Sequence, residues 1–332
     1  MTRPLAMLLF VVTGCESVAR SAGDEVAAEE PAPLPSAAAP VEHGPHPKLR
    51  SSHRCGECHV AIAESWSSSA HAGSAKDPLY LAMRDDAKDA SCDSCHAPLA
   101  HLLEPGSAVA GEGVTCDACH TAERVELDGD RGRLVLNTTD NVKRGPLCDA
   151  RDHYFHRVAC EPMFERSEMC AACHTLSRHA GATTIAVHGE YEEWKASPLG
   201  PAGSDASCQS CHMPSRDGEV AEGWEGRARH SAHGGATSTS SPLQVALTLQ
   251  PAADGRIAVV ANVTNADAGH ALPTGLPGRR LRIAARVVDG SGAELDRWEH
   301  VYGTWLVDDA GNEAPFYSAT RVAKDDRIAA EA

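Results

Sequence analysis

The chain has 332 residues; 42% are apolar but only 4% are aromatic, and the sequence includes 13 Cys and 18 His. This length is enough for two domains. The formal net charge of −16 excludes a general nucleic-acid-binding protein, because no basic surplus is present to neutralise phosphates. No apolar run is long enough to span a membrane as a helix. The abundance of Cys and His instead indicates metal, haem or disulfide chemistry.

The N-terminus has the composition of an export signal. Arg3 precedes the apolar stretch 5–12, and small residues follow up to Cys15, which is the order found in secretory signals. The run Val-Thr-Gly-Cys15 resembles a bacterial lipobox, in which the Cys is acylated and becomes the first residue; an ordinary secretory signal is the alternative. We expect residues 1–14 to be a lipoprotein signal peptide. Residues 15–47, rich in Ala, Pro and Glu without a hydrophobic period, are expected to form a flexible tether.

The sequence Cys-x-x-Cys-His occurs five times. The copies are Cys55/Cys58-His59, Cys92/Cys95-His96, Cys116/Cys119-His120, Cys170/Cys173-His174 and Cys208/Cys211-His212. This pattern is the attachment signature of c-type haem. The two thiols add to the vinyl groups of one haem, and the adjacent His lies beneath the iron as its proximal ligand. We therefore predict five covalently bound haem c groups.

Two other functions of paired cysteines fit the pattern less well. Structural zinc sites also use Cys-x-x-Cys, but they do not require a His after every second Cys. A thioredoxin-like redox site needs a single Cys-x-x-Cys. Ten of the 13 Cys belong to the five motifs and Cys15 is assigned to the lipid, which leaves Cys148 and Cys160. An exported protein can keep a disulfide between these two, and two free thiols are the alternative.

The five motifs are densely spaced. Residues 51–215 contain all of them, so little chain is left for a regular core, and the porphyrins are expected to replace the missing aromatic side chains as buried apolar surface. We predict short α-helices and loops around the haems in a domain spanning residues 48–235. The repeated segments 89–98 and 205–214, with similar offsets elsewhere, suggest a duplicated two-haem unit with the third motif inserted between the copies.

The haem region resembles multihaem cytochromes c related to cytochrome c-554. The resemblance rests on Trp66-x-x-Ser-x-His71-Ala and on the sequences around the other motifs, over residues 51 to about 235. In that group the His after the Trp-Ser segment ligates a haem iron on the distal side, which implies this role for His71. A weaker resemblance implies the same distal-ligand role for His156 and for either His230 or His233. The second Trp-Ser segment has Pro198 where the His is expected, so His188 is our candidate there.

Beyond residue 241 the pattern changes. No Cys occurs after Cys211, and apolar residues alternate with polar ones in segments 243–249, 257–263 and 281–287, which predicts β-strands with one buried face. We expect residues 241–332 to form a small, all-β, sandwich-like domain. Its Gly269-His270-x-x-Pro-Thr-Gly loop resembles one found beside haem domains in the same cytochromes. His270 is therefore either a distal haem ligand or an exposed residue of a Gly/Pro turn.

These features favour an exported electron carrier over an enzyme. Haems with two axial His ligands can pass electrons but have no open coordination site, so we expect low-spin bis-His haems that connect redox partners at the cell envelope. Membrane contact is expected through the N-terminal lipid only, on the periplasmic face or cell surface. By resemblance, Glu16 favours the outer membrane.

The acidic charge suits a redox partner with a basic docking patch. Nucleic acid is not an expected partner, and a homo-oligomer is possible.

Two alternative functions stay open. One is an oxidoreductase that acts on a small nitrogen or sulfur compound at a five-coordinate haem with a polar distal pocket. The sequence lacks the Cys-x-x-Cys-Lys variant that pentahaem nitrite reductases use, and no catalytic residue can be named. The other is a subunit of a polymeric haem conduit.

Overall fold

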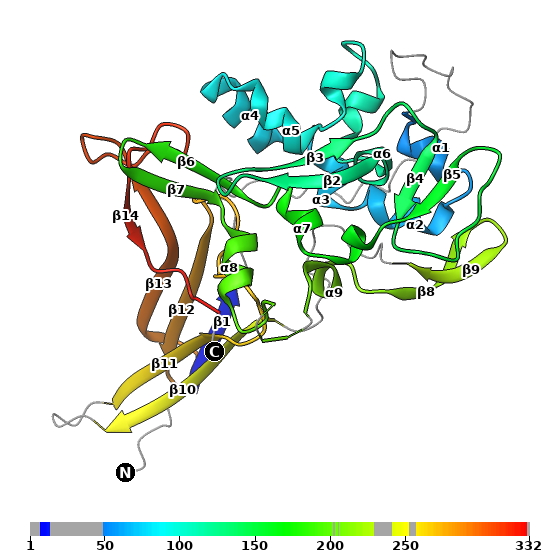
Figure 1. Cartoon of the computed structure of the whole chain (residues 1–332). Helices are drawn as coiled ribbons and strands as arrows, with labels where there is room; N and C mark the ends of the chain where they lie inside the picture. The colour runs from blue at the N-terminus through cyan, green and yellow to red at the C-terminus, as the bar shows by residue number, and fades with distance from the viewer. Residues whose placement is uncertain are drawn as a thin grey trace.

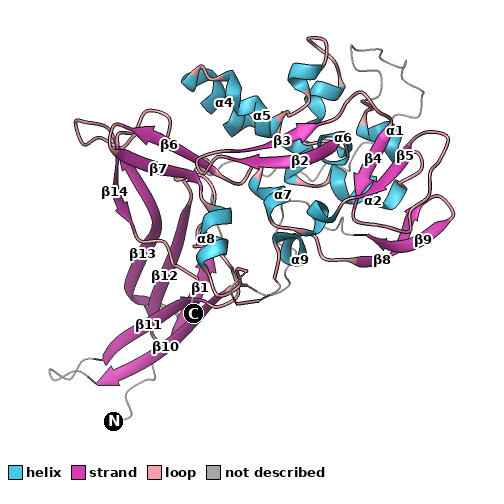
Figure 2. Ribbon diagram, in the orientation of Figure 1, coloured by secondary structure: helices cyan, strands magenta, loops and turns pink. Residues whose placement is uncertain are grey.

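A computed structural model describes residues 7–13, 49–201, 203–204, 206–228, 241–251 and 257–330. The described chain contains two kinds of structure (Figure 1, Figure 2). Residues 49–228 form short helices and small hairpins, whereas the segments from residue 241 onward form longer strands. Among the described residues, no helix is long and apolar enough to cross a membrane.

The helices are short, as predicted. The α-helices are α1 (Ser52–Gly56), α2 (Val60–Ser67), α3 (Ala70–Gly73), α4 (Pro78–Ala87), α5 (Asp93–His96), α6 (Cys116–His120), α7 (Glu168–Ala171), α8 (Glu190–Ala196) and α9 (Cys208–His212). Single 3-10 turns are η1 (Ala90–Cys92), η2 (Ala100–Leu102), η3 (Val109–Glu112) and η4 (Pro162–Glu165). The longest of these, α4, begins where the Asp77 side chain accepts a hydrogen bond from the Tyr80 N–H and Pro78 occupies the first turn, both of which favour a helix start.

The strands of the haem-motif region form two-stranded sheets. They are β2 (Ala122–Leu127) with β3 (Gly132–Leu136), β4 (Val142–Gly145) with β5 (Arg157–Cys160), β6 (Leu176–Ala180) with β7 (Thr183–His188), and β8 (Arg216–Ala221) with β9 (Trp224–Ala228). The β4–β5 pair is parallel and the others are antiparallel. These strand pairs were not predicted, since only short helices and loops were expected in this region.

Longer strands make up the C-terminal part. β10 (Leu243–Pro251) pairs with β11 (Ile257–Asn265), and β12 (Arg280–Val288), β13 (Glu294–Val307) and β14 (Arg321–Asp325) form a sheet with β1 (Met7–Thr13) in the order β1-β12-β13-β14. β1 lies antiparallel to β12, from the Met7–Val288 pair to the Thr13–Arg282 pair. The segment predicted as part of a signal peptide therefore forms an edge strand.

The strands were predicted correctly, but the described residues form no clear sandwich. β10 and β11 are an isolated pair in the described sheets, at the lower edge of Figure 1. Two of the residues expected on the buried face, Leu249 and Ile257, are 60% and 66% exposed. The reason is that alternation specifies a strand with one apolar face but not the layer that covers it.

Several alanines beside the motifs are fully buried. Ala118, Ala122, Ala171 and Ala172 are at most 1% exposed. One apolar cluster joins Ile185 of β7 to Leu306 and Ala319 of the C-terminal part. This cluster fixes the β6–β7 hairpin beside β14 (Figure 1) and thereby connects the fourth motif to the C-terminal sheet.

Candidate functional site

Each of the five motifs includes a single turn of helix. α5, α6 and α9 contain one or both cysteines and end at the motif His, whereas α1 and α7 contain the first Cys. In the first motif, the N–H groups of Cys58 and His59 both donate to the carbonyl of Cys55, at 3.2 and 2.9 Å. A helical turn places residues three apart on one face, so both thiols of a motif can face the same group. All ten motif cysteines are free of disulfides.

Cysteines of different motifs approach one another. The Cys55 thiol hydrogen bonds with that of Cys116, Cys95 bonds with Cys173, and Cys170 bonds with Cys208. The first motif therefore adjoins the third, the second adjoins the fourth, and the fourth adjoins the fifth. Cofactors held by these thiols are close neighbours.

The structural repeat differs from the predicted one. The Trp66 indole donates to the carbonyl of Val114, two residues before the third motif, and Trp194 donates to Ala206, two residues before the fifth; both distances are 2.8 Å. The Oγ atoms of Ser52 and Ser167, each three residues before a motif Cys, likewise accept from the N–H of Cys116 and of Cys208. The repeated unit thus pairs the first motif with the third and the fourth with the fifth. It was missed because the most similar sequences, around the second and fifth motifs, do not occupy these equivalent positions.

Several motif histidines have their Nδ1 atom against a backbone carbonyl. Nδ1 of His59 lies 2.5 Å from the carbonyl of Val220, that of His120 lies 2.5 Å from Arg144, and that of His96 lies 3.3 Å from Ser74. Hydrogen bonding of Nδ1–H orients a His to bind a metal through Nε2. Burial lowers the pKa values of His96, His120 and His212, which favours the neutral imidazole that binds iron.

Three motif histidines face a second His that was predicted as a distal ligand. The ring centres are 6.3 Å apart for His59 and His156, 6.5 Å for His174 and His71, and 6.1 Å for His212 and His270. Two imidazoles on opposite sides of one metal ion, each with its nitrogen about 2 Å from the metal, have ring centres roughly 6 Å apart. The thiols and the paired imidazoles therefore fit the donor set of covalently attached haem.

His188, the remaining described candidate, lies between two motifs. It ends β7, and its Nδ1 is 3.4 Å from Oε1 of Glu190, the same oxygen that lies 3.7 Å from Nδ1 of His174. Burial lowers the pKa of His96, and the nearby His188 lowers it further. His188 is thus close to both the second and the fourth motif.

The loop carrying His270 is held by buried polar groups. The Asn265 amide, which is 0% exposed, donates to the His270 carbonyl at 2.8 Å. The Ala271 N–H donates to Oε2 of Glu193 at 2.9 Å, and Oε1 of Glu193 forms a 2.7 Å ion pair with Arg327. These contacts connect α8, next to the fifth motif, with the C-terminal part. Asn265, Glu190 and Glu193 could not be recognised from the sequence, because single polar residues in a strand or a helix carry no pattern.

Cys148 and Cys160 form a disulfide. Cys160 is the last residue of β5, and the disulfide closes the loop that includes His156. Cys15, His230 and His233 lie outside the described residues. The ring of His120 stacks on Phe164, with ring centres 5.5 Å apart.

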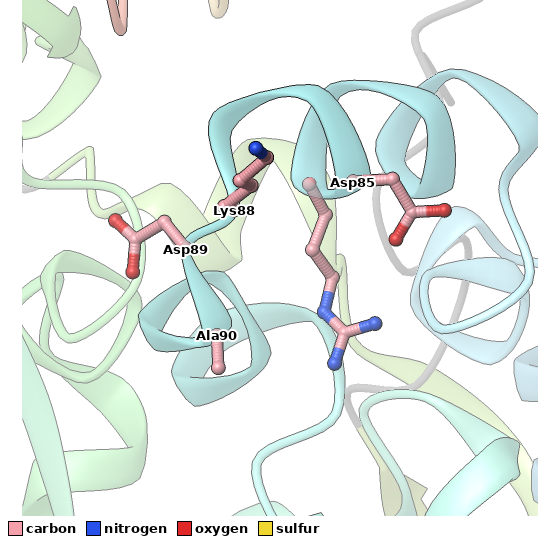
Figure 3. Close-up of a pocket in the computed structure, with 5 residues that line it drawn as sticks. Asp85, Lys88, Asp89 and Ala90 are labelled. Carbon is pink, nitrogen blue, oxygen red and sulfur yellow. The ribbon is translucent and has the colours of Figure 1, made fainter.

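Two surface cavities lie beside the second motif. Figure 3 shows the first, of about 290 Å³, lined by Arg84, Asp85, Lys88, Asp89 and Ala90 at the end of α4. Arg84 also lines the second, of about 310 Å³, and pairs with Asp93 at 2.9 Å. Tyr80 lines this second cavity and stacks on His96, with ring centres 4.0 Å apart. Tyr80 and Arg84 thus support the second motif from the side of α4.

Comparisons with protein-family models and with curated proteins found no match. Among solved structures, the chain is similar to a penta-heme cytochrome c552 from Thermochromatium tepidum, with 25% sequence identity, 85% of each chain covered and a TM-score of 0.67. This similarity supports covalently bound haem c and a haem-based electron-transfer or redox role. Together with the five motifs and the paired imidazoles, it relates this chain to the multihaem cytochromes c.

Proposed function

We propose that the chain is an exported electron-transfer protein that holds five haem c groups. The observation that carries the proposal is the spacing of 6.1–6.5 Å between motif histidines and second histidines. The attachment residues are Cys55, Cys58, Cys92, Cys95, Cys116, Cys119, Cys170, Cys173, Cys208 and Cys211. When bound, the haems supply one-electron redox couples at five neighbouring positions.

The histidines are assigned as axial ligand pairs. The ring spacings support His59 with His156, His174 with His71, and His212 with His270. His188 is proposed as the second ligand opposite His96, supported by its effect on the pKa of His96. For His120 the candidate remains His233, or His230 beside it. Two His ligands at each site leave no coordination position for a substrate, which favours electron transfer over catalysis.

The contacts between motif cysteines support a proposed arrangement of the sites. The first is next to the third, and the fourth is next to both the second and the fifth. Cys119, in the third motif, lies near Cys170 and Cys173 of the fourth, which supports adjacent third and fourth sites. The fourth site is thus the branch point of the proposed network, with the first, second and fifth sites at its ends.

The remaining parts of the proposal concern location and partners. A relationship to cytochrome c-554, a haem domain at 48–235 and a β domain at 241–332 are supported by the motifs quoted above. Acylation of Cys15 would anchor the protein to the envelope, with the outer membrane favoured. The charge of −16 favours a redox partner that presents a basic patch.

The test uses the full chain matured in a host that attaches haem c. The pyridine haemochrome assay is expected to give five haems per chain that survive acid-acetone extraction, because thioether bonds are covalent. Electron paramagnetic resonance of the oxidised protein is expected to show low-spin haems. Fewer than five haems, or a high-spin haem that turns over hydroxylamine, nitrite or a sulfur oxyanion, would contradict the proposal.

A further inference from the structure

Two of the assigned iron ligands differ from five of the others in what Nδ1 contacts. Nδ1 of His59, His96, His120, His156 and His270 lies against a backbone carbonyl. Nδ1 of His174 and of His188 instead faces one carboxylate, that of Glu190, with Oε1 at 3.7 and 3.4 Å. A carboxylate is charged, so it is a stronger acceptor than a neutral carbonyl.

Glu190 is held in this position by the chain around it. It is the first residue of α8 and follows His188, the end of β7, by two residues. Its side chain is 16% exposed, and its Oε2 atom is buried without a hydrogen-bond partner in the part of the chain that the structure describes. Its Oε1 atom lies 3.7 Å from Nδ1 of His174 and 3.4 Å from Nδ1 of His188. The carboxylate therefore has two oxygens available for two imidazole donors.

The two imidazoles cannot flank a single iron. Both present Nδ1 to the same oxygen, at 3.7 and 3.4 Å. The two Nδ1 atoms therefore lie closer together than the roughly 8 Å that separates the Nδ1 atoms of two imidazoles bound through Nε2 on opposite sides of one iron. His174 is opposed by His71, whereas His188 acts on Cys95 and His96 of the second motif. Contact between the Cys95 and Cys173 thiols shows that the second and fourth motifs adjoin at this point.

We propose that Glu190 is a positioning residue shared by two haem sites: its carboxylate accepts the Nδ1–H of an iron ligand at the second motif, His188, and at the fourth, His174. This inference rests on the ligand pairs of the proposed function. An acceptor at Nδ1 fixes the ring orientation and tautomer and raises the basicity of the ligand. A more basic ligand and a nearby negative charge both favour the ferric state, so Glu190 lowers the reduction potentials of both sites.

The test is a potentiometric titration of the full-length holoprotein, followed by the absorption bands and by electron paramagnetic resonance. In Glu190→Gln, which keeps the shape and one acceptor but loses the charge, two of the five haems are expected to shift to more positive potentials. Glu190→Ala removes both the charge and the acceptor. The potentials of the same two haems are expected to shift further, and their g values are expected to change. The haem count and the other three potentials are expected to stay as in the wild type.

Glu192→Gln is the matched control. Glu192 lies on the same helix, is 53% exposed and is paired only with Lys195 at 3.9 Å among the described residues. The same loss of one charge at this position is expected to leave all five potentials unchanged. An equal shift in this control would assign the effect to net charge and overturn the role of Glu190.

Other outcomes separate this inference from the proposed function. Unchanged potentials in both Glu190 variants would overturn the role of Glu190, while wild-type protein with five low-spin haems would still support electron transfer. A shift confined to one haem would overturn the sharing. Wild-type protein without haem at the second or fourth motif would contradict the proposed function itself.

If the variants do not mature, His-selective ¹⁵N NMR of the reduced wild type provides the test. Two ligand Nδ1–H signals are expected to be shifted downfield from those of the histidines that donate to backbone carbonyls. A single population of signals would contradict the proposal.

Discussion

The buried amide of Asn265 spans both sides of the turn that carries His270: its Nδ2 donates to the His270 carbonyl at 2.8 Å and its Oδ1 accepts from the Ala268 N–H at 3.1 Å. Asn265 ends β11 and is 0% exposed. The side chain therefore sets the position of the His270 backbone from the strand, and the ring faces His212 as a consequence.

Replacing Asn265 by Ala is expected to loosen this turn. Asn265→Ala removes two part-buried hydrogen bonds, to the His270 carbonyl and from the Ala268 N–H, each of which contributes about 1 kcal/mol of stability. A fraction of the haem at the fifth motif is expected to lose its sixth ligand, seen as a high-spin signal in electron paramagnetic resonance. Asn262→Ala, at an exposed position of the same strand, is the control. A fully low-spin spectrum and unchanged unfolding in Asn265→Ala would show that other contacts hold His270.

The C-terminal sheet is expected to lose stability in acid. Burial raises the pKa of Asp326, but hydrogen bonds from the Lys324 ammonium and the Gly303 N–H outweigh it, so the pKa lies below the ordinary value of 3.8. A carboxyl whose pKa is depressed in the folded state contributes stability above its unfolded pKa and loses it as pH falls through the folded pKa. The unfolding temperature is therefore expected to be steady from about pH 7 to about pH 5 and to fall below about pH 4. Asp326→Asn is expected to flatten this fall, and an equally steep fall in that variant would exclude Asp326 as its source.

Much of the haem chemistry could be predicted from the sequence because it is local. The attachment residues of a Cys-x-x-Cys-His motif are consecutive in the chain, and one helical turn is enough to place them correctly. The partners of His59 and His212 are 97 and 58 residues away along the chain (156 − 59 and 270 − 212). Resemblance to known cytochromes suggested His156 and His270 as ligands, but only the fold shows which motif His each one faces. His71 was nominated by its Trp-Ser segment, but its proximity to the fourth motif has no local signal.

What failed was prediction from patterns that describe one element without its neighbours. Alternation predicted β10 and β11 but not that Leu249 and Ile257 would be exposed. Similar sequences around the second and fifth motifs suggested a repeat, whereas the backbone contacts of Trp66 and Trp194 define a different one. Glu190 could have been suspected from its place two residues after His188, but its contact with His174 is tertiary.

The proposed lipid anchor at the N-terminus can be tested by replacing Cys15. Changing Cys15 to Ser removes the thiol that the lipobox-like sequence presents for acylation, and burial of acyl chains is the proposed means of membrane contact. The variant is expected to move from the membrane fraction to the soluble fraction with the same absorption spectrum. Retention of the variant in membranes would indicate an uncleaved signal or a membrane-bound partner.

The last prediction concerns His71, the second ligand assigned opposite His174. Its backbone is fixed on α3, since the His71 carbonyl accepts from the Ser74 hydroxyl at 2.8 Å and from the Val114 N–H at 3.0 Å. Trp66 donates to the carbonyl of the same Val114, so the Trp-Ser segment holds the His71 backbone against the third motif while its ring faces the fourth. In His71→Ala one haem is therefore expected to become high-spin and to bind carbon monoxide or cyanide, while the others stay low-spin because each has its own ligand pair. His101→Ala, at an exposed position of the same region, is expected to change neither property. An entirely low-spin His71→Ala protein that binds no added ligand would remove His71 from the ligand set and leave the fourth site with a different partner.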